Sequence, residues 1–233
     1  MRRGEVLAGT KTALVTGASK GIGRCYALQL AALGYNVLMV ASGEVELLAT
    51  AEEVRTANPK VWVRTLVKDL ATPTAAKELF AWTEQEEIKV DVLINNAGIF
   101  SFCDILNTPI ERIQRVIYLH DITSTLSCRL YAADMIKRGG GRILNMSSFS
   151  IWMPYPGLSL YSASKAYLKS FSVAFAKEVK DKGVTVTAIC PAGIATDLYG
   201  LSPALQRFGL KSGILMSPES CARRSLNGMF RGQ

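Results

Sequence analysis

Six short, strongly apolar segments are spread along the chain, and longer segments with helical periodicity lie between them. Apolar runs of this length, without the polar alternation of a half-exposed strand, are typical of strands buried on both faces of a parallel sheet. The helical segments supply the crossovers that parallel strands need. The pattern therefore predicts an α/β fold with a doubly wound parallel sheet, and it argues against a sandwich or a helix bundle. The expected strands are Thr12–Thr16, Asn36–Val40, Val61–Leu66, Val92–Asn95, Arg142–Met146 and Val184–Cys190.

Helical patterns fill the gaps between these strands. Gly34 follows the first of them, at a position where a glycine with positive φ commonly ends a helix. The chain has 233 residues, which is enough for one α/β domain and too few for a second substantial one. We therefore expect a single domain over residues 1–233. The expected helices are Gly21–Leu33, Glu44–Ala57, Thr74–Glu87, Ile110–Arg138, Ser162–Asp181 and Pro218–Met229.

Bulk composition excludes several classes of protein. No apolar run has the length of a signal-peptide core or a membrane span, so we expect a cytoplasmic protein. The formal net charge is +8, but no run of Lys and Arg exceeds two residues, which favours a diffuse basic surface over a nucleic-acid partner. The five cysteines are widely spaced and contain no C-x-x-C pair, so neither a disulfide framework nor a metal site is predicted. They are Cys25, Cys103, Cys128, Cys190 and Cys221.

A glycine-rich turn joins the first expected strand to the first expected helix. Its glycines, Gly17, Gly21 and Gly23, follow the spacing G-x-x-x-G-x-G. Glycines at a strand–helix junction let the backbone approach a pyrophosphate, whose charge is met by amide N–H groups at the positive end of the helix dipole. Ser19, Lys20 and Ile22 belong to the same turn. This junction predicts a dinucleotide-binding site.

A second turn follows the fourth expected strand. It reads Asn95-Asn96-Ala97-Gly98, and its small residues would let the chain pass close to a ligand at the carboxyl edge of the sheet. Taken alone, such a tetrapeptide fits any tight turn. Its place directly after a buried strand makes Asn96, Ala97 and Gly98 candidates for cofactor contact.

Ser148, Tyr161 and Lys165 form the candidate catalytic set. Ser148 follows the fifth expected strand, and Tyr161 and Lys165 are four residues apart, on one face of a helix. A free phenol has a pKa of about 10, and a nearby fixed cation lowers it toward the working range. Tyr161 would then exchange a proton with an alcohol or carbonyl oxygen, and Ser148 would hold that oxygen by a hydrogen bond.

Together these motifs resemble the short-chain dehydrogenase/reductase family, from about Thr12 to about Leu198, and within it NADP-type members such as 3-oxoacyl and ketosteroid reductases. The resemblance implies a single-domain Rossmann fold and hydride transfer between a nicotinamide and a carbonyl or secondary alcohol. It also implies that Asp69 and Leu70 contact the adenine. By the same resemblance, the segment after the sixth strand holds the nicotinamide carboxamide. Its expected contact residues are Pro191, Ile194 and Thr196.

The cofactor is expected to be NADP(H) rather than NAD(H). Members that use NAD usually place an acidic residue at the end of the second strand, where this chain has Val40-Ala41-Ser42-Gly43. Lys20 matches a basic residue of the NADP-type signature, and Ser42 could donate a hydrogen bond to the same 2′-phosphate. An ordinary solvated role for Lys20 is the alternative.

His120 departs from the family pattern, in which many members carry an asparagine that belongs to the proton relay. It is the only histidine of the chain. It could replace the asparagine as a proton-relay group, because imidazole donates, accepts and titrates near neutrality. It could equally be a helix-packing residue with both nitrogens satisfied, or a sign of weakened turnover. The sequence leaves these three interpretations of His120 open.

The C-terminal part of the resemblance concerns the substrate, the assembly and the chain end. Apolar residues after Ser148, and a lid expected around residues 197–216, predict a bulky hydrophobic carbonyl or alcohol substrate. The segments Thr123–Met135 and Tyr161–Lys177 resemble those that pair in family homodimers and homotetramers.

The seventh strand common in the family is missing from the sequence. A truncated chain, a natural short form and a lost tail are equally compatible with this ending.

Two other classes of function remain open at this level. One is an NADPH-binding regulator or sensor with weak or no turnover, which is suggested by His120 in place of the asparagine. The other is a module that contacts an acyl carrier or a membrane, which is suggested only by the net charge of +8.

Overall fold

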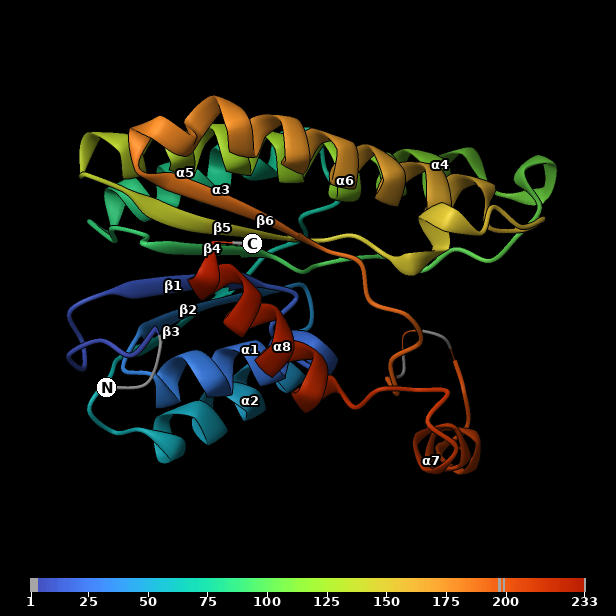
Figure 1. Ribbon diagram of the computed structural model, residues 1–233, viewed down its shortest axis with the longest axis horizontal. Helices are drawn as coiled ribbons and strands as arrows, with labels where there is room; N and C mark the ends of the chain where they lie inside the picture. The colour runs from blue at the N-terminus through green and yellow to red at the C-terminus, as the bar shows by residue number, and fades with distance from the viewer. Residues whose placement is uncertain (1–3, 197, 199, 233) are drawn as a thin grey trace.

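Six parallel strands form one sheet in the order β3-β2-β1-β4-β5-β6 in the computed structural model, which describes residues 4–196, 198 and 200–232. The strand order reverses at β1, which has β2 on one side and β4 on the other (Figure 1). Doubly wound sheets bind ligands at such a point, outside the carboxyl ends of the strands. The strands are β1 Thr12–Thr16, β2 Asn36–Ala41, β3 Val63–Val67, β4 Val92–Asn95, β5 Gly141–Met146 and β6 Val184–Ile189.

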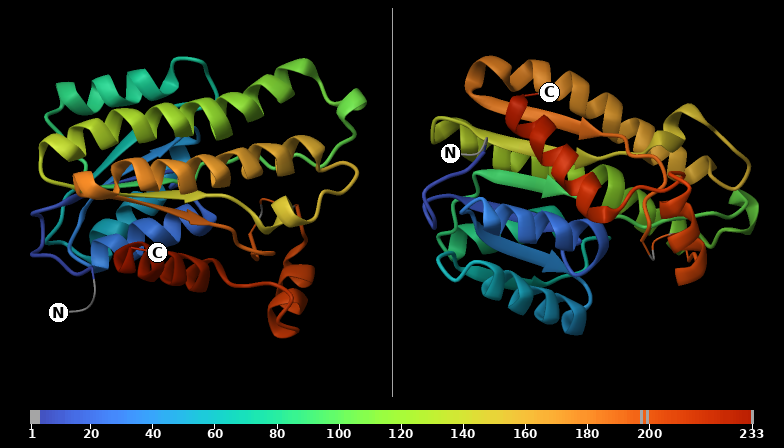
Figure 2. Two further views of the ribbon diagram at one scale, coloured as in Figure 1. Left: turned by 45° about the horizontal axis from the view of Figure 1, so that its top comes forward. Right: turned by 60° about the horizontal axis from the view of Figure 1, so that its bottom comes forward.

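Helices cover both faces of the sheet. Figures 1 and 2 show α1, α2 and α8 on one face and α3, α4, α5 and α6 on the other. None of the helices that the structure describes is long and apolar enough to cross a membrane. The helices are α1 Gly21–Ala32, α2 Glu44–Ala57, α3 Ala75–Gln85, α4 Ile110–Ile117, α5 Ser124–Lys137, α6 Ser159–Val179, α7 Pro203–Lys211 and α8 Pro218–Arg231.

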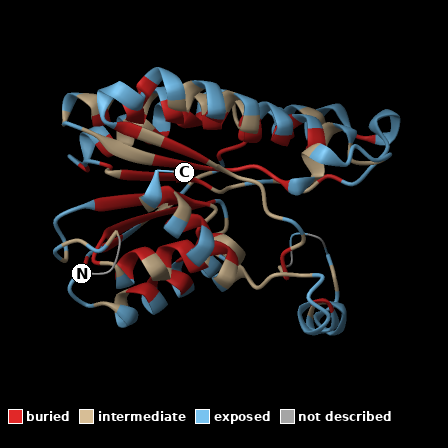
Figure 3. Ribbon diagram, in the orientation of Figure 1, coloured by how far each residue is buried: buried red, intermediate tan, exposed pale blue. Residues whose placement is uncertain are grey.

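The core consists of two apolar clusters, one on each face of the sheet. Successive residues of a strand point to opposite faces, so Val15 packs into the cluster under α1 while Leu14 packs into the cluster under α5. Val37 and Leu38 of β2 divide in the same way. The central strands are buried throughout (Figure 3). Burial on both faces is why these strands are unbroken apolar runs in the sequence.

The predicted doubly wound parallel α/β fold is confirmed, and all six expected strands are present. Among the strands, the largest difference from the expected bounds is in β3, which begins at Val63 instead of Val61. The N–H of Trp62 donates to the side-chain Oδ1 of Asn36, and the ladder with β2 starts one residue later. The N-terminal end of α6 also differs, because the helix begins at Ser159, directly after the turn at Gly157, where φ is +86°.

The prediction of one continuous α-helix over Ile110–Arg138 is wrong. A π-helical segment, η2, covers Tyr118–Thr123 and separates α4 from α5. The wider π turn keeps the helix axis continuous, so periodicity along the sequence does not reveal it. Single π turns inside α-helices often mark functional sites. This one carries His120.

The C-terminal region contains one unpredicted helix and no seventh strand among the described residues. Ser202 caps α7 by accepting a hydrogen bond from the N–H of Leu205, and Pro203 occupies its first turn. Gly209 is the only buried residue of α7, which stands away from the body of the molecule (Figure 1). The lid expected around residues 197–216 therefore contains a helix. Asp197 and Tyr199 of that segment lie outside the described residues.

Candidate active site

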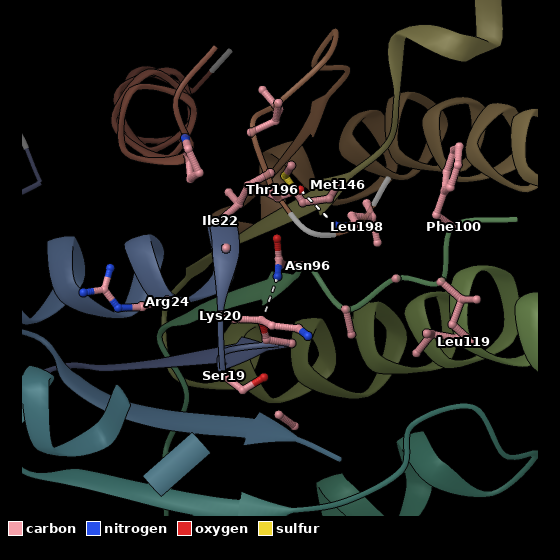
Figure 4. A pocket seen from close by; sticks show the side chains of 18 of the residues that line it. Ser19, Lys20, Ile22, Arg24, Asn96, Phe100, Leu119, Met146, Thr196 and Leu198 are labelled. Carbon is pink, nitrogen blue, oxygen red and sulfur yellow. Dashed lines mark hydrogen bonds between the residues drawn. The ribbon is translucent and has the colours of Figure 1, made fainter. Parts of the chain in front are cut away.

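A cavity of about 710 Å³ lies at the carboxyl edge of the sheet and gathers nearly all of the predicted site residues. Gly23 and His120 are the two that do not line it. Figure 4 shows Ser19 and Lys20 before α1, Asn96 after β4, and Thr196 around this space, with Phe100 and Leu119 at one side. The predicted residues that line the cavity are Gly17, Ser19, Lys20, Gly21, Ile22, Ser42, Asp69, Leu70, Asn96, Ala97, Gly98, Ser148, Tyr161, Lys165, Pro191, Ile194 and Thr196.

The two glycine-containing turns are packed directly against each other. Gly17 has a φ of +65°, and a Cβ there would lie 2.8 Å from the Cα of Ala97. Asn96 Nδ2 donates to the carbonyl oxygen of Thr16 over 3.0 Å, and the Asn96 N–H donates to Thr16 Oγ1 over 3.0 Å. Gly23 lies behind the turn, where a Cβ would be 2.0 Å from the Gly17 carbonyl oxygen. Gly23 therefore shapes the turn without lining the cavity.

The N-terminus of α1 is open to an anion. Lys20 occupies the cap position with no side-chain hydrogen bond to the first turn, and that turn contains no acidic residue. The first N–H groups of a helix lack intrahelical partners, and the helix dipole adds positive charge there. A turn in which Gly17 and Gly21 carry no Cβ atom, at a helix start without a side-chain cap, fits the pyrophosphate of a dinucleotide.

The end of β2 carries no acidic side chain toward the cavity. Lys20 and Ser42 are both exposed at its rim, and no ion pair of Lys20 is found within the described residues. Arg24, one helical turn after Lys20, also lines the cavity and pairs with Glu53. No sequence motif indicates Arg24, which lies in the first turn of α1 after Lys20.

Asp69 lies at the same cavity and is already paired. Its Oδ2 accepts a hydrogen bond from Arg115 Nη1 over 2.8 Å, and its Oδ1 accepts from the N–H of Ala71 over 2.9 Å. Burial alone would raise the pKa of the Asp69 carboxyl, but these two hydrogen bonds bring it below its ordinary value. Arg115 and Arg112 of α4 line the cavity as well, and no sequence motif indicated them.

Tyr161 and Lys165 lie on the buried face of α6, close to the end of β5. Lys165 Nζ donates to the carbonyl oxygen of Met146 over 2.8 Å and lies 5.8 Å from the centre of the Tyr161 ring. Burial lowers the pKa of Lys165 to about 8, because the charged ammonium is poorly solvated there. The Phe100 ring packs edge-on against Tyr161, with 5.1 Å between ring centres. Ser148 Oγ accepts a hydrogen bond from the N–H of Ser150.

His120 is fully buried behind this group, and both of its ring nitrogens have partners. Nε2 accepts a hydrogen bond from the Ile99 N–H over 2.9 Å, so Nδ1 carries the proton and donates to Ser164 Oγ over 2.8 Å. Ser164 Oγ in turn donates to the carbonyl oxygen of Tyr161. Burial, reinforced by the charge of Lys165, holds the pKa of His120 well below its usual range. The imidazole is therefore neutral near pH 7.

Most of the apolar residues expected at the substrate wall are exposed and do not line the cavity. Trp152, Met153 and Tyr155, between Ser148 and Tyr161, are 54%, 61% and 65% exposed. Leu205 and Phe208 of α7 are also exposed, whereas Leu198 lines the cavity. Of these apolar residues, only Leu198 lines the cavity.

The model of the short chain dehydrogenase family matches residues 11–204. A very-long-chain 3-oxoacyl-CoA reductase of Coccidioides immitis is 31% identical over 94% of this chain and 61% of its own length. A 3-oxoacyl-[acyl-carrier-protein] reductase of Synechocystis is 36% identical over 81% of this chain and 76% of its own length. The chain thus spans about three fifths of the length of the first of these relatives.

Solved structures of the same fold superpose closely. A short-chain dehydrogenase of Sphingobium yanoikuyae in complex with NADPH has a TM-score of 0.85 and 29% identity, over 96% of this chain and 85% of that one. A bulky-bulky ketone specific alcohol dehydrogenase of Comamonas testosteroni has a TM-score of 0.83 and 28% identity, over 97% of this chain and 84% of that one. With the family model matching most of its length and the motif residues gathered at one sheet edge, the chain belongs to the short chain dehydrogenase family.

Proposed function

We propose that this protein is an NADP(H)-dependent oxidoreductase that transfers a hydride between the nicotinamide and a carbonyl or secondary alcohol, with Tyr161 as general acid and base. The observation that carries the proposal is the convergence of Ser148, Tyr161 and Lys165 with the glycine turn in one cavity. Proton donor, oxyanion support and dinucleotide cradle are thereby all within one site.

We propose a place among the cavity residues for each part of the cofactor. The N–H groups at the start of α1 would bind the pyrophosphate, Asp69 and Leu70 would contact the adenine, and Ile194 and Thr196 would hold the carboxamide. When bound, the cofactor supplies or accepts the hydride. Lys20 and Ser42 would bind the 2′-phosphate, since no carboxylate at the end of β2 would repel it. NADPH-bound family structures with this fold support the same preference.

The protein's own contribution to the chemistry is proton transfer and charge stabilisation. In the reducing direction, the Tyr161 O–H gives its proton to the substrate oxygen while Ser148 donates a hydrogen bond to that oxygen. The buried Lys165 ammonium stabilises the phenolate that Tyr161 becomes when it gives up its proton. His120, with both nitrogens bonded, fixes the Ile99 backbone and the first turn of α6, and so acts as a positioning residue.

The proposed substrate is a bulky hydrophobic carbonyl compound, and a 3-oxoacyl thioester is the leading class. Exposed apolar side chains in the segment after Ser148 and on α7 support a long apolar substrate portion. Two relatives are named as reductases of very-long-chain 3-oxoacyl-CoA and of 3-oxoacyl-[acyl-carrier-protein].

The proposed assembly is a homodimer, or a homotetramer that contains it, through the outward faces of α5 and α6. Ala166, Ser170 and Ala174 are exposed at a spacing of four on α6, and such small residues allow two helices to approach closely. A groove of about 520 Å³ follows the same face. Light scattering should give a dimer or tetramer mass, and Ser170→Arg should give a monomer. A monomeric unsubstituted protein would refute this assembly.

The decisive experiment combines binding and turnover. NADPH should raise the melting temperature more than NADH at equal concentration, and NADPH oxidation should follow addition of at least one 3-oxoacyl thioester or bulky ketone. Tyr161→Phe should keep the NADPH-induced stabilisation and lose turnover, because it lacks only the proton-transferring hydroxyl. Stabilisation by NADPH without turnover of any compound would refute the enzyme and favour an NADPH-binding regulator.

A further inference from the structure

The cavity carries more positive than negative charge. Six cationic side chains line it, against two acidic ones among the residues that the structure describes. A ligand with negative charge is favoured in such a cavity. The cationic residues are Lys20, Arg24, Lys68, Arg112, Arg115 and Lys165, and the acidic residues are Asp69 and Glu219.

Five of the six cations already have a partner or a proposed role. Three of them pair with a carboxylate, one is proposed to bind the 2′-phosphate, and one lies beside Tyr161. Arg112 is the sixth, and it makes no ion pair within residues 4–196, 198 and 200–232. The pairs are Arg24–Glu53, Lys68–Glu78 and Arg115–Asp69, and the two cations with proposed roles are Lys20 and Lys165.

Arg112 lies on the side of the cavity where the substrate carbonyl is proposed to bind. It precedes Arg115 by three residues in α4, and both line the cavity. Its Nη2 donates a hydrogen bond to the carbonyl oxygen of Phe100 over 2.7 Å. The ring of Phe100 in turn packs against Tyr161. Arg112 and Tyr161 therefore contact the same residue, and Figure 4 shows that residue at one side of the cavity with Arg24 at the other.

The Arg112 guanidinium keeps most of its hydrogen-bonding capacity. It has five N–H donors, and the bond to Phe100 is the one that its side chain makes within the described part of the chain. The acidic residues near it in the sequence do not neutralise it, because Glu111 does not line the cavity and Asp104 Oδ1 accepts from the N–H of Leu106. A planar guanidinium with free donors binds phosphate through two parallel hydrogen bonds.

The phosphates of the cofactor are proposed to bind elsewhere in the cavity. The proposed place of the pyrophosphate is the start of α1, and that of the 2′-phosphate is at Lys20 and Ser42. Neither place is on α4. An anionic group at Arg112 would therefore belong to the substrate.

We propose that Arg112 binds the phosphate of a phosphopantetheine arm, which carries the acyl group of a 3-oxoacyl thioester. This inference rests on the proposed function and narrows its substrate class. The same phosphate occurs in coenzyme A and in acyl carrier proteins, whereas a neutral bulky ketone has none. The arm between the phosphate and the thioester is long and flexible, so the phosphate can reach Arg112 while the 3-oxo group lies at Tyr161.

The test uses two substrates that differ in one phosphate. Acetoacetyl-phosphopantetheine carries it, acetoacetyl-pantetheine does not, and the reacting atoms are the same. The wild-type KM should be about tenfold lower for the phosphorylated substrate, as expected for one hydrogen bond to a charged group. High salt should reduce this difference, because exposed charges are screened. Acetoacetyl-CoA and an acetoacetyl acyl carrier protein, compared by kcat/KM in the same assay, distinguish the two sources of the phosphate.

Arg112→Gln removes the charge and should abolish the advantage of the phosphorylated substrate. Its KM for acetoacetyl-phosphopantetheine should rise by about tenfold. The KM for acetoacetyl-pantetheine, kcat and NADPH binding should stay unchanged. Arg112→Lys keeps the charge and should retain part of the advantage. Arg64→Gln is the matched control, since Arg64 is exposed outside the cavity and pairs with Glu86, and it should behave as wild type.

A second readout does not depend on turnover. Coenzyme A should bind the NADP⁺-loaded protein in calorimetric titrations, and Arg112→Gln should weaken this binding by about tenfold. Equal wild-type KM values for the two substrates would overturn the proposal. An Arg112→Gln enzyme that loses as much activity toward acetoacetyl-pantetheine would also overturn it, because Arg112 would then act by holding Phe100. Weaker NADPH binding would reassign Arg112 to the cofactor. If wild type reduces none of these compounds and no bulky ketone, the proposed function fails, and coenzyme A binding that depends on Arg112 would still support the phosphate site.

Discussion

Replacing Gly23 by alanine tests whether the close approach of α1 to the preceding turn builds the cofactor site. A Cβ at Gly23 would lie 2.0 Å from the Gly17 carbonyl oxygen and 2.7 Å from Asn96 Nδ2. Ordinary van der Waals contacts of a Cβ begin at 3.4 Å, so α1 and the turn must separate by more than 1 Å. The clash is with backbone, which no rotamer change relieves.

The expected magnitude follows from two opposing effects. Forced backbone shifts in a packed interior cost about 1–3 kcal/mol. Alanine offsets about 1 kcal/mol of this through its better helix propensity. A net loss of up to about 2 kcal/mol lowers the melting temperature of a domain of this size by up to about 8 °C. Because the N–H groups of α1 move with the helix, NADPH should stabilise Gly23→Ala far less than wild type.

Thermal unfolding with and without NADPH measures both effects. Gly43→Ala is the control, since Gly43 has a φ of −92° and its Cβ would meet only the mobile carboxylate end of Glu46, at 2.9 Å. It should unfold within about 0.5 kcal/mol of wild type. The reasoning is refuted if Gly23→Ala melts at or above the wild-type temperature and keeps the full NADPH-induced shift.

Three further predictions concern charge and hydrogen bonding at the site. Lys20→Glu should weaken NADPH binding by about tenfold or more and leave NADH binding nearly unchanged, because a carboxylate would face the 2′-phosphate; equal losses for both cofactors in fluorescence titrations would contradict this role. His120→Phe should destabilise the fold by about 1–3 kcal/mol in urea unfolding, because the partly buried Ile99 N–H loses its acceptor; an unchanged midpoint would show that this bond contributes little. Lys165 has a folded-state pKa of about 8 against about 10.4 when unfolded, so the unfolded chain binds more protons between these values and stability rises with pH there. Lys165→Met should lose that rise, and a persisting rise would assign it to other groups.

Most of the fold could be predicted because the sheet is buried on both faces. Central strands such as Asn36–Ala41 are buried at every position and therefore stand out as apolar runs. The helix α7 could not be predicted in the same way, since a helix with one buried residue, Gly209, has no apolar periodicity that the core imposes. The π segment Tyr118–Thr123 was hidden for a different reason, because one wider turn leaves the helical pattern on both sides intact.

The residues of the candidate site also differ in how far the sequence reveals them. Some features depend on the backbone alone and are visible as motifs, because no residue type other than glycine fits there. Gly17, which packs directly on Ala97, is an example. Side chains such as Arg24 and Arg115 reach the cavity only through helix packing. Their residue types are common on any helix surface, and sequence spacing alone does not distinguish them from solvated charges.

His120 stands where many family members carry an asparagine, and its contacts favour a structural role. Holding the Ile99 backbone requires a fixed acceptor, which the neutral imidazole provides. Burial, reinforced by the charge of Lys165, keeps the pKa of His120 well below its usual range, so the imidazole does not change charge around neutral pH. His120→Phe should therefore lower stability without removing a titrating step from the pH profile of kcat near neutral pH. A His120→Phe enzyme that loses such a step and keeps the wild-type stability would contradict the positioning role.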